Sequence, residues 1–282
     1  MPIVPIKIKS GEFRNSFKTA LCYGRPRSGK TRFLASWPRP LILAEASERG
    51  WVTIETMPSE GYFEPDRPPL VWPIEDAQQM QEALGDARGY FERGEALTLG
   101  IDSLTFYQDA LFAANKKRWI AGNPGKPVDG RALYGQLGEQ LGDLRQDTHT
   151  WPCNVVWLAL EKAPDTDAPI GGPLLTGKTR DRFPAGCDHI FRHESYTVPN
   201  ATGGEDCFFE MHTTVHGRWL AGGRDSGMLE PSIFNPTYRD LMEQLNLPDP
   251  IAAFENARKQ AATVVTRRVV STNTSTPATN GR

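Results

Sequence analysis

The chain has few cysteines, no excess of either charge and no long hydrophobic run, and each absence narrows the possible classes of protein. Its 282 residues include 4 cysteines, none of them in a Cys-x-x-Cys pair, which favours reduced cytosolic thiols over a disulfide framework. With 32 Lys and Arg against 34 Asp and Glu, the formal net charge is -2. No overall basic field therefore indicates nucleic-acid binding, and any such contact must use a local patch.

Membrane segments are also missing from the sequence. A membrane-spanning helix requires about 18 apolar residues in a row, and the start of the chain lacks the apolar stretch of a signal peptide. We therefore expect a cytoplasmic protein without membrane contact. Its composition is ordinary for a folded domain. We expect an N-terminal arm over residues 1–16, one domain over 17–250, and a helix end with a basic, disordered tail over 251–282, because the chain from Ser271 has no sizeable apolar residue.

Short apolar runs alternate with segments of helical periodicity along most of the chain. Runs of strand length occupy residues 17–23, 41–44, 70–72, 97–101 and 155–160. Strands that alternate with helices predict an α/β fold with a mostly parallel sheet flanked by helices. After Asp188, shorter runs such as 207–215 and 219–220 are separated by Gly and Pro, which predicts antiparallel strands at the edge of the sheet.

A phosphate-binding motif follows the first apolar run. Backbone amides of the GxxxxGK[ST] loop surround phosphate oxygens, its lysine neutralises the outer phosphates, and its hydroxyl binds magnesium. The motif stands between a predicted strand and a predicted helix, as this chemistry requires. The sequence therefore predicts a nucleotide site for ATP and Mg²⁺, formed by Gly24, Arg25, Pro26, Arg27, Ser28, Gly29, Lys30, Thr31 and Arg32.

An aspartate ends the predicted strand over residues 97–101. A magnesium ion next to Thr31 needs a carboxylate at the end of a neighbouring strand, and Asp102 supplies one. We interpret Asp102 as the Walker B aspartate and, with Thr31, as a magnesium ligand. The alternative is that Asp102 caps the helix that begins at Leu104, a role that Ser103 would serve equally well.

Hydrolysis also needs a carboxylate that orients or deprotonates the attacking water. Glu45 ends the run over residues 41–44, and the carboxyl ends of parallel strands meet at one edge of the sheet. We therefore expect Glu45 to be catalytic, together with Lys30. Glu48 is the competing candidate, and a solvated loop glutamate is the alternative for both.

Several segments together resemble the RecA-like P-loop ATPases that phages encode, of the AAA and single-strand annealing types. They are LCYGRPRSGKTRFLASWPRPLILAEASERG, LGIDSLTFY, NVVWLALEK and GGPLLTGKTRDRFPAGCDHIFR, within residues 17–245. The resemblance implies a RecA-like ATPase that acts on single-stranded DNA in phage recombination, annealing or replication. It also implies a homo-oligomer with ATP at the subunit interfaces, a single-strand-binding protein as a possible partner, and the host cytoplasm. It matches Glu45 to the catalytic glutamate and Asp102 to the Walker B aspartate.

The resemblance also assigns roles to later residues. Where the family has a polar sensor this chain has Leu160, which leaves Glu161 as the substitute. Arg224 matches the position from which the family sends a cation into a neighbour's ATP site, with an exposed hairpin arginine as the alternative. The DNA-contacting loop would follow Lys162 as a flexible, Gly- and Pro-rich segment whose cations contact phosphates. Those cations are Lys178, Arg180 and Arg182, and a second candidate is the stretch from Lys116 to Trp119.

Two other functions use the same phosphate-binding motif. A small-molecule kinase needs a lid over a closed acceptor pocket, and the sequence shows no arginine-rich lid after a helix pair. A nucleotide-gated binding or assembly module holds ATP with little hydrolysis, and Leu160 keeps this alternative open. Zinc is not favoured, because the histidines and cysteines lack the close pairs of a tetrahedral site and are interpreted as strand residues. They are Cys187, His189, His193, Cys207, His212 and His216.

Overall fold

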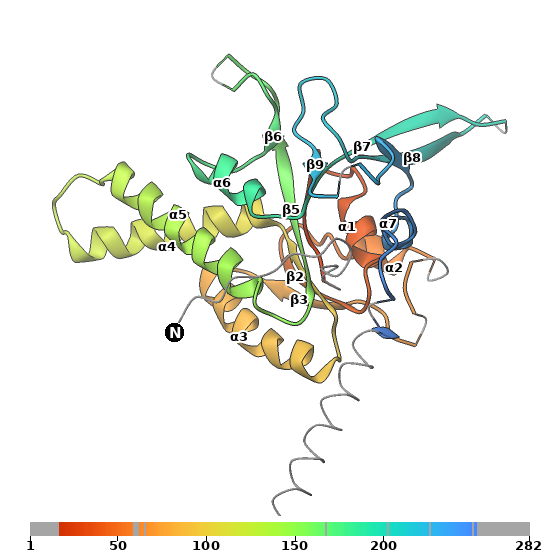
Figure 1. Cartoon of the computed structure of the whole chain (residues 1–282). Coiled ribbons are helices and arrows are strands. Elements are labelled where there is room, and N and C mark those ends of the chain that lie inside the picture. The colour runs from red at the N-terminus through yellow and green to blue at the C-terminus, as the bar shows by residue number, and fades with distance from the viewer. Residues whose placement is uncertain are drawn as a thin grey trace, which may run out of the picture.

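The architecture comes from a computed structural model, which describes residues 17–58, 62–64, 66–166, 168–201, 203–225, 227–249 and 251–252. The expected arm over residues 1–16 and most of the expected tail lie outside the described residues. Helices cover both faces of a central sheet, and a long hairpin formed by β7 and β8 projects from one side (Figure 1). No helix in the described part of the chain is long and apolar enough to cross a membrane.

Ten strands form the sheet, in the order β10-β8-β7-β1-β5-β4-β2-β3, with β6 paired to β5 and β9 paired to β7. The pairs from β3 through β7 along this order are parallel, whereas β8 and β10 are antiparallel. The predicted α/β class with antiparallel edge strands is therefore confirmed. The strands are β1 (Thr19–Gly24), β2 (Pro40–Glu45), β3 (Leu70–Ile74), β4 (Thr98–Asp102), β5 (Asn154–Lys162), β6 (Gly172–Pro173), β7 (His189–Pro199), β8 (Glu205–His212), β9 (Gly222–Gly223) and β10 (Ser232–Phe234).

The helices begin at capping residues and bury apolar stripes. Asp76, Ser103 and Asp129 cap the three long helices by accepting hydrogen bonds from backbone amides of the first turn. The helices are α1 (Lys30–Ala35), α2 (Val52–Glu55), α3 (Ala77–Arg93), α4 (Leu104–Gly122), α5 (Gly130–Thr148), α6 (Thr179–Ala185) and α7 (Tyr238–Leu245).

Each face of the sheet carries its own apolar core. Val155 and Trp157 of β5 pack with α3, α4 and α5 on one face, while Val156 and Leu158 pack with α1 and α7 on the other. Successive strand residues point to opposite faces, so a strand covered on both faces needs a continuous apolar run. That requirement explains the apolar texture of β5, whose residues 154–159 are all buried.

Three expectations about the later chain were wrong in part. The first strand after Asp188 is not an edge strand, because β7 pairs parallel with β1 before it pairs antiparallel with β8. Residues 219–220 form no strand, and Trp219 makes only isolated bridges. Lys178, Arg180 and Arg182 do not lie in a flexible loop, since Lys178 precedes α6 and the two arginines lie within it. The ring of Phe183, buried against Trp157, stabilises this helix although it contains Pro184 and is flanked by Gly177 and Gly186.

Candidate nucleotide-binding site

The loop between β1 and α1 needs glycine at both ends. Gly24 is buried, and a side chain there would collide with the backbone carbonyl of His193 in β7. Gly29 has a φ of 86°, in the left-handed region, and an added Cβ would lie 2.6 Å from the Phe209 ring of β8. The loop is therefore fixed in shape by the close packing of β7 and β8 against it.

The ammonium group of Lys30 lies inside this loop. Its Nζ donates hydrogen bonds to the carbonyl oxygens of Gly24 (3.0 Å) and Arg25 (2.8 Å), and the hydroxyl of Ser28 lies 3.4 Å away. Burial lowers the pKa of Lys30, and the nearby charge of Asp102 opposes that shift. A partly desolvated cation, held by only two carbonyl oxygens and a hydroxyl of the loop, favours an anion such as a phosphate group.

Thr31 and Asp102 lie side by side, as the magnesium site requires. The Thr31 hydroxyl donates to Asp102 Oδ2 at 2.8 Å. Asp102 is not the cap of α4, because Ser103 fills that position and accepts from the Phe106 amide. Gly50 borders the pair, and a Cβ there would lie 3.3 Å from Asp102 Oδ2 and 3.7 Å from Thr31 Oγ1. A hydroxyl and a carboxylate beside a residue without a side chain fit a magnesium ion, which prefers oxygen ligands.

Burial shapes the electrostatics of Asp102. Desolvation raises its pKa, while the hydrogen bond from Thr31 and the charge of Lys30 lower it. A cation placed beside Asp102 would relieve the cost of a buried negative charge. The carboxylate is therefore held in a state that favours a positive ligand.

The two candidate glutamates lie at the same edge as Asp102. Glu45 ends β2 and accepts a hydrogen bond from the Ser47 hydroxyl at 2.5 Å. It lines a cavity of about 320 Å³ between the ends of β2 and β3 and the first turn of α4. Glu48 is more exposed, and burial, Glu45 and Asp102 raise its pKa while Lys30 lowers it. Both carboxylates are close enough to Asp102 to affect its charge or be affected by it, and a catalytic role for either stays a prediction.

Glu161 supplies a polar contact one residue beyond Leu160. Its side chain is 8% exposed, and its Oε1 lies 2.9 Å from Nε of Arg25. Arg25 belongs to the predicted phosphate loop, the segment between β1 and α1 that begins at Gly24 and ends at Gly29. Its Oε2 lies 3.4 Å from Nε of Arg192 in β7, and Arg192 also pairs with Glu194 at 2.8 Å. The end of β5 thus contacts the phosphate loop through Glu161. Glu161 is the residue expected to replace the polar sensor that is missing at Leu160.

Two aromatic residues lie at this site although the sequence did not predict them there. The Arg32 guanidinium lies 4.4 Å from the centre of the Tyr62 ring, donates to the Tyr62 hydroxyl, and lies 5.7 Å from the Phe209 ring centre. Tyr62 and Phe209 come from distant parts of the chain. No local pattern signals their approach, because it depends on how β8 packs on the phosphate loop.

Arg224 lies far from the phosphate loop of its own chain. It is exposed, follows β9, and its Nη1 lies 3.4 Å from Asp188 Oδ1. Asp188 accepts a hydrogen bond from Thr19 at the start of β1, whereas the phosphate loop follows the end of β1. Arg224 therefore lies at the opposite end of β1 from the loop of its own chain that carries Lys30.

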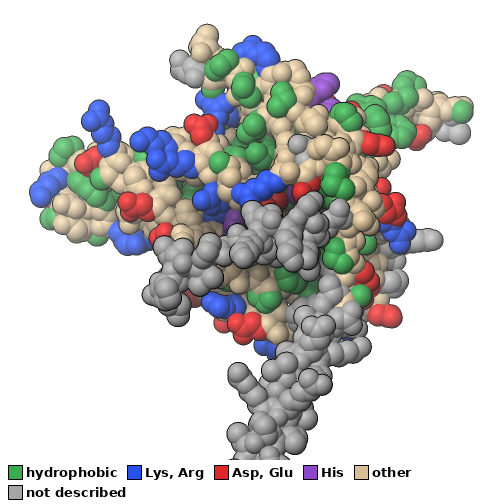
Figure 2. Space-filling view, viewed as in Figure 1, with side chains coloured by type: hydrophobic (Ala, Val, Ile, Leu, Met, Phe, Trp, Pro, Cys, Tyr) green, Lys and Arg blue, Asp and Glu red, His purple; other side chains and the backbone are tan. Residues whose placement is uncertain are grey.

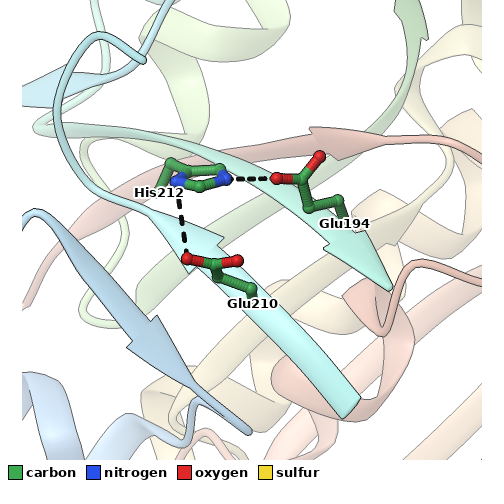
Figure 3. A group of neighbouring side chains, drawn as sticks. All are labelled: Glu194, Glu210 and His212. Carbon is green, nitrogen blue, oxygen red and sulfur yellow. Dashed lines mark hydrogen bonds and ion pairs between the residues drawn. The ribbon is translucent and has the colours of Figure 1, made fainter. Parts of the chain in front are cut away.

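The histidines and cysteines form no joint cluster in the described part of the chain. His212 Nε2 lies 2.5 Å from Glu194 and its Nδ1 4.0 Å from Glu210 (Figure 3). Both ring nitrogens thus face carboxylates, and Arg192 already pairs with Glu194. This cluster is an ion-pair network across β7 and β8. The four residues His189, His193, Cys207 and His212 do lie in strands, while Cys187 precedes β7 and His216 follows β8.

Comparison with known proteins adds only a distant likeness. No family profile matches the chain, and no curated protein matches it. Among solved structures, the crystal structure of the RadB recombinase is similar, with 14% sequence identity and a TM-score of 0.43, over 77% of this chain and 86% of that one. So distant a likeness indicates neither ligand nor activity, and the site rests on its own geometry.

Proposed function

We propose that this chain is a magnesium-dependent ATPase that binds ATP at residues 24–32 and hydrolyses its terminal phosphoanhydride bond. The observation that carries the proposal is the 2.8 Å hydrogen bond between Thr31 and Asp102, next to the buried ammonium of Lys30. These residues are far apart in sequence, and the order β1-β5-β4 brings them to one edge of the sheet. Phosphoryl transfer needs a lysine and a hydroxyl from the phosphate loop and a carboxylate from a neighbouring strand.

Lys30 and the loop amides bind the phosphates. On ATP binding, the Lys30 ammonium exchanges its bonds to the Gly24 and Arg25 carbonyls for charge-assisted bonds to phosphate oxygens. Thr31 and Asp102 hold the magnesium ion, which neutralises charge on the phosphates when bound. These contacts orient the terminal phosphoryl group and account for nucleotide affinity.

Glu45 acts on the attacking water. Its carboxylate accepts a proton from water, the water oxygen forms a bond to the terminal phosphorus, and the bond from that phosphorus to the bridging oxygen breaks, which gives ADP and phosphate. Ser47 donates to Glu45 and fixes the orientation of the carboxylate. Arg224 of a neighbouring subunit in a homo-oligomer stabilises the charge that develops on the phosphoryl group.

Calorimetric titration of ATP with magnesium into Lys30→Ala tests the phosphate site. Loss of the charged hydrogen bonds weakens binding by about 2 to 3 kcal/mol. Lys116→Ala, on the exposed surface of α4, removes the same charge elsewhere and should bind ATP like the unmodified chain. Equal affinity of a folded Lys30→Ala protein and this control would reject the site.

The resemblance extends the proposal to single-stranded DNA. We expect the ATPase to act on single strands in recombination, annealing or replication, as a homo-oligomer. The homo-oligomer is supported by the exposed position of Arg224, which is remote from the phosphate loop of its own chain. Turnover measured with and without single-stranded DNA, on a sample whose mass is determined by light scattering, tests this. ATP binding without turnover in either condition would indicate a nucleotide-gated assembly module instead, and phosphate transfer to a small molecule would indicate a kinase.

A further inference from the structure

A basic groove of about 1410 Å³ runs between α5 and the segment that leads from Leu174 into α6. Glu139 is the acidic residue among those that line it, so cations dominate the groove although the whole chain has a net charge of -2. Lys and Arg side chains gather over the part of the surface where α4, α5 and α6 lie (Figure 2). The cationic lining residues are Arg131, Arg145, Lys162, Lys178, Arg180 and Arg182.

Glycines form one wall of the groove. Gly135, Gly138 and Gly142 lie on one face of α5, and a Cβ at Gly135 or Gly142 would meet no described atom within 4 Å. Glycine inside a helix costs about 0.5 to 1 kcal/mol relative to alanine. No close packing in the described part of the chain requires it at these two positions. Bare helix backbone leaves room for a large ligand to approach.

An aromatic ring stands at the same groove. Tyr134 is 50% exposed, and one face of its ring stacks on Phe112 with centres 4.8 Å apart. Because half of Tyr134 is exposed, part of its surface is available to a flat ligand. Cations that track a phosphate backbone, together with an aromatic face for an unstacked base, are the features of single-strand binding.

We infer that this groove binds single-stranded nucleic acid, with its phosphates on the groove cations and a base on Tyr134. The inference names the surface for the partner of the proposed ATPase, and only its coupling to ATP rests on that function. A duplex is a poorer ligand, because its bases are already stacked and paired and cannot reach Tyr134.

Two contacts join the groove to the nucleotide site. In α4, which follows Asp102, Gln108 Oε1 accepts from the amide (2.7 Å) and hydroxyl (3.1 Å) of Thr176 in the groove wall. In β5, Lys162 lines the groove while its neighbour Glu161 pairs with Arg25 of the phosphate loop. We therefore expect that a shift of the end of β4 or of β5 on ATP binding also moves the groove wall.

Fluorescence anisotropy of a labelled oligo-dT with the full chain tests the inference. The variant is Arg131→Gln/Lys178→Gln/Arg182→Gln, which spares Arg145 and Arg180 because these donate to backbone carbonyls. We expect affinity to fall about tenfold or more, and the slope of log affinity against log salt to decrease by about 2, at about 0.7 per lost contact. The comparison variant is Lys116→Gln/Lys117→Gln/Arg118→Gln on α4, the other candidate stretch for DNA contact, which has the same change in charge outside the groove and which the inference requires to keep its affinity.

Steric variants provide an independent test. Gly142→Leu places a side chain in open space within the groove, so we expect oligo-dT binding to be lost while the circular dichroism and ATP titration stay unchanged. Gly85→Leu in α3 is the matched control, because a Cβ at Gly85 also meets no described atom within 4 Å. Tyr134→Ala should weaken binding about tenfold through loss of one stacked base.

Four results would each overturn a part of the inference. The groove is wrong if the groove triple variant keeps its affinity and salt slope, or if the α4 comparison variant loses as much. The assignment to single strands is wrong if polyglutamate displaces oligo-dT equally well per charge, which would indicate an acidic protein partner. The coupling is wrong if ATP with magnesium leaves oligo-dT affinity unchanged. Failure of the ATPase itself is seen separately, as absent ATP binding by calorimetry with oligo-dT binding intact.

Discussion

The phosphate edge, which is the edge of the sheet where Lys30, Thr31 and Asp102 lie, differs from the basic groove beside it in how its charges are held. At the phosphate edge, Lys30 and Asp102 are buried charges: Lys30 is held by hydrogen bonds to carbonyls of its own loop, and Asp102 by one from Thr31, which is distant in sequence. In the groove, Arg131, Lys178 and Arg182 are exposed, and glycine replaces side chains on the facing helix. A site for one small, highly charged ligand needs fixed and desolvated groups, whereas a long flexible polyanion is attracted by exposed charge.

This contrast predicts different consequences of mutation. Changes at the phosphate edge should alter turnover, magnesium dependence and folding stability together, because the same atoms serve ligand and fold. Changes in the groove should alter nucleic-acid affinity alone. The groove variants described above should therefore show none of the changes in turnover or folding stability that are expected of Glu45, of the buried histidines of β7 and of Asp102.

The largest effect is expected from Glu45→Gln. The amide keeps the shape of the side chain but cannot accept a proton from water, so turnover should fall by about 10²- to 10⁴-fold while ATP affinity stays similar. Steady-state phosphate release and calorimetry measure the two quantities. Glu48→Gln is the matched control and should retain most of the activity. Loss of turnover in Glu48→Gln, with a near normal Glu45→Gln, would transfer the role to Glu48.

A pH effect on stability is expected from two buried histidines in β7. Burial, with a smaller effect of nearby Lys18, lowers the pKa of His189 to about 4, and burial with Lys30 and His212 lowers that of His193 to about 3. An ordinary histidine in the unfolded chain has a pKa of about 6.5, so the unfolded state binds protons first as pH falls. Stability should be full above about pH 6.5 and decrease below it, by at most about 2.7 kcal/mol per pH unit for the pair.

Urea unfolding at a series of pH values measures this effect. His189→Gln/His193→Gln should flatten the profile between about pH 4 and 6.5, the range in which the unfolded chain holds protons on both histidines and the folded chain does not. His216→Gln, at an exposed position after β8, is the control and should leave the profile unchanged. An identical slope in the double variant and the control would show that other groups govern acid unfolding.

A smaller effect is expected from Asp102→Asn in the ligand-free protein. Burial raises the pKa of Asp102, so its charge destabilises the fold above that pKa, and the neutral amide should stabilise the protein at pH 7 by about 1 kcal/mol. The gain should vanish at low pH, where the carboxyl group is protonated. Magnesium should no longer increase the melting temperature in the presence of ATP. A destabilised Asp102→Asn protein would mean that the bonds to Thr31 outweigh desolvation.

The phosphate motif was readable from the sequence because it is local. Gly24 to Thr31 are contiguous, and the apolar runs on either side fix the strand and the helix that hold them. The prediction that Asp102 and Glu45 lie at the same edge of the sheet followed from the rule that the carboxyl ends of parallel strands meet there. The segment with Lys178, Arg180 and Arg182 was misread as a flexible loop, because Gly and Pro nearby outweighed the burial of Phe183, which a sequence does not display.

The sequence by itself determined the class of fold and the position of the predicted phosphate-binding motif, since both depend on periodicity and on contiguous spacing. Only the tertiary structure decided that Ser103 caps α4, that Glu161 contacts Arg25, that Phe209 packs on Gly29, and that α5 and α6 enclose a basic groove. Each of these depends on side chains far apart in the chain. Their approach is set by the order of strands and by packing across the sheet, which no local pattern records.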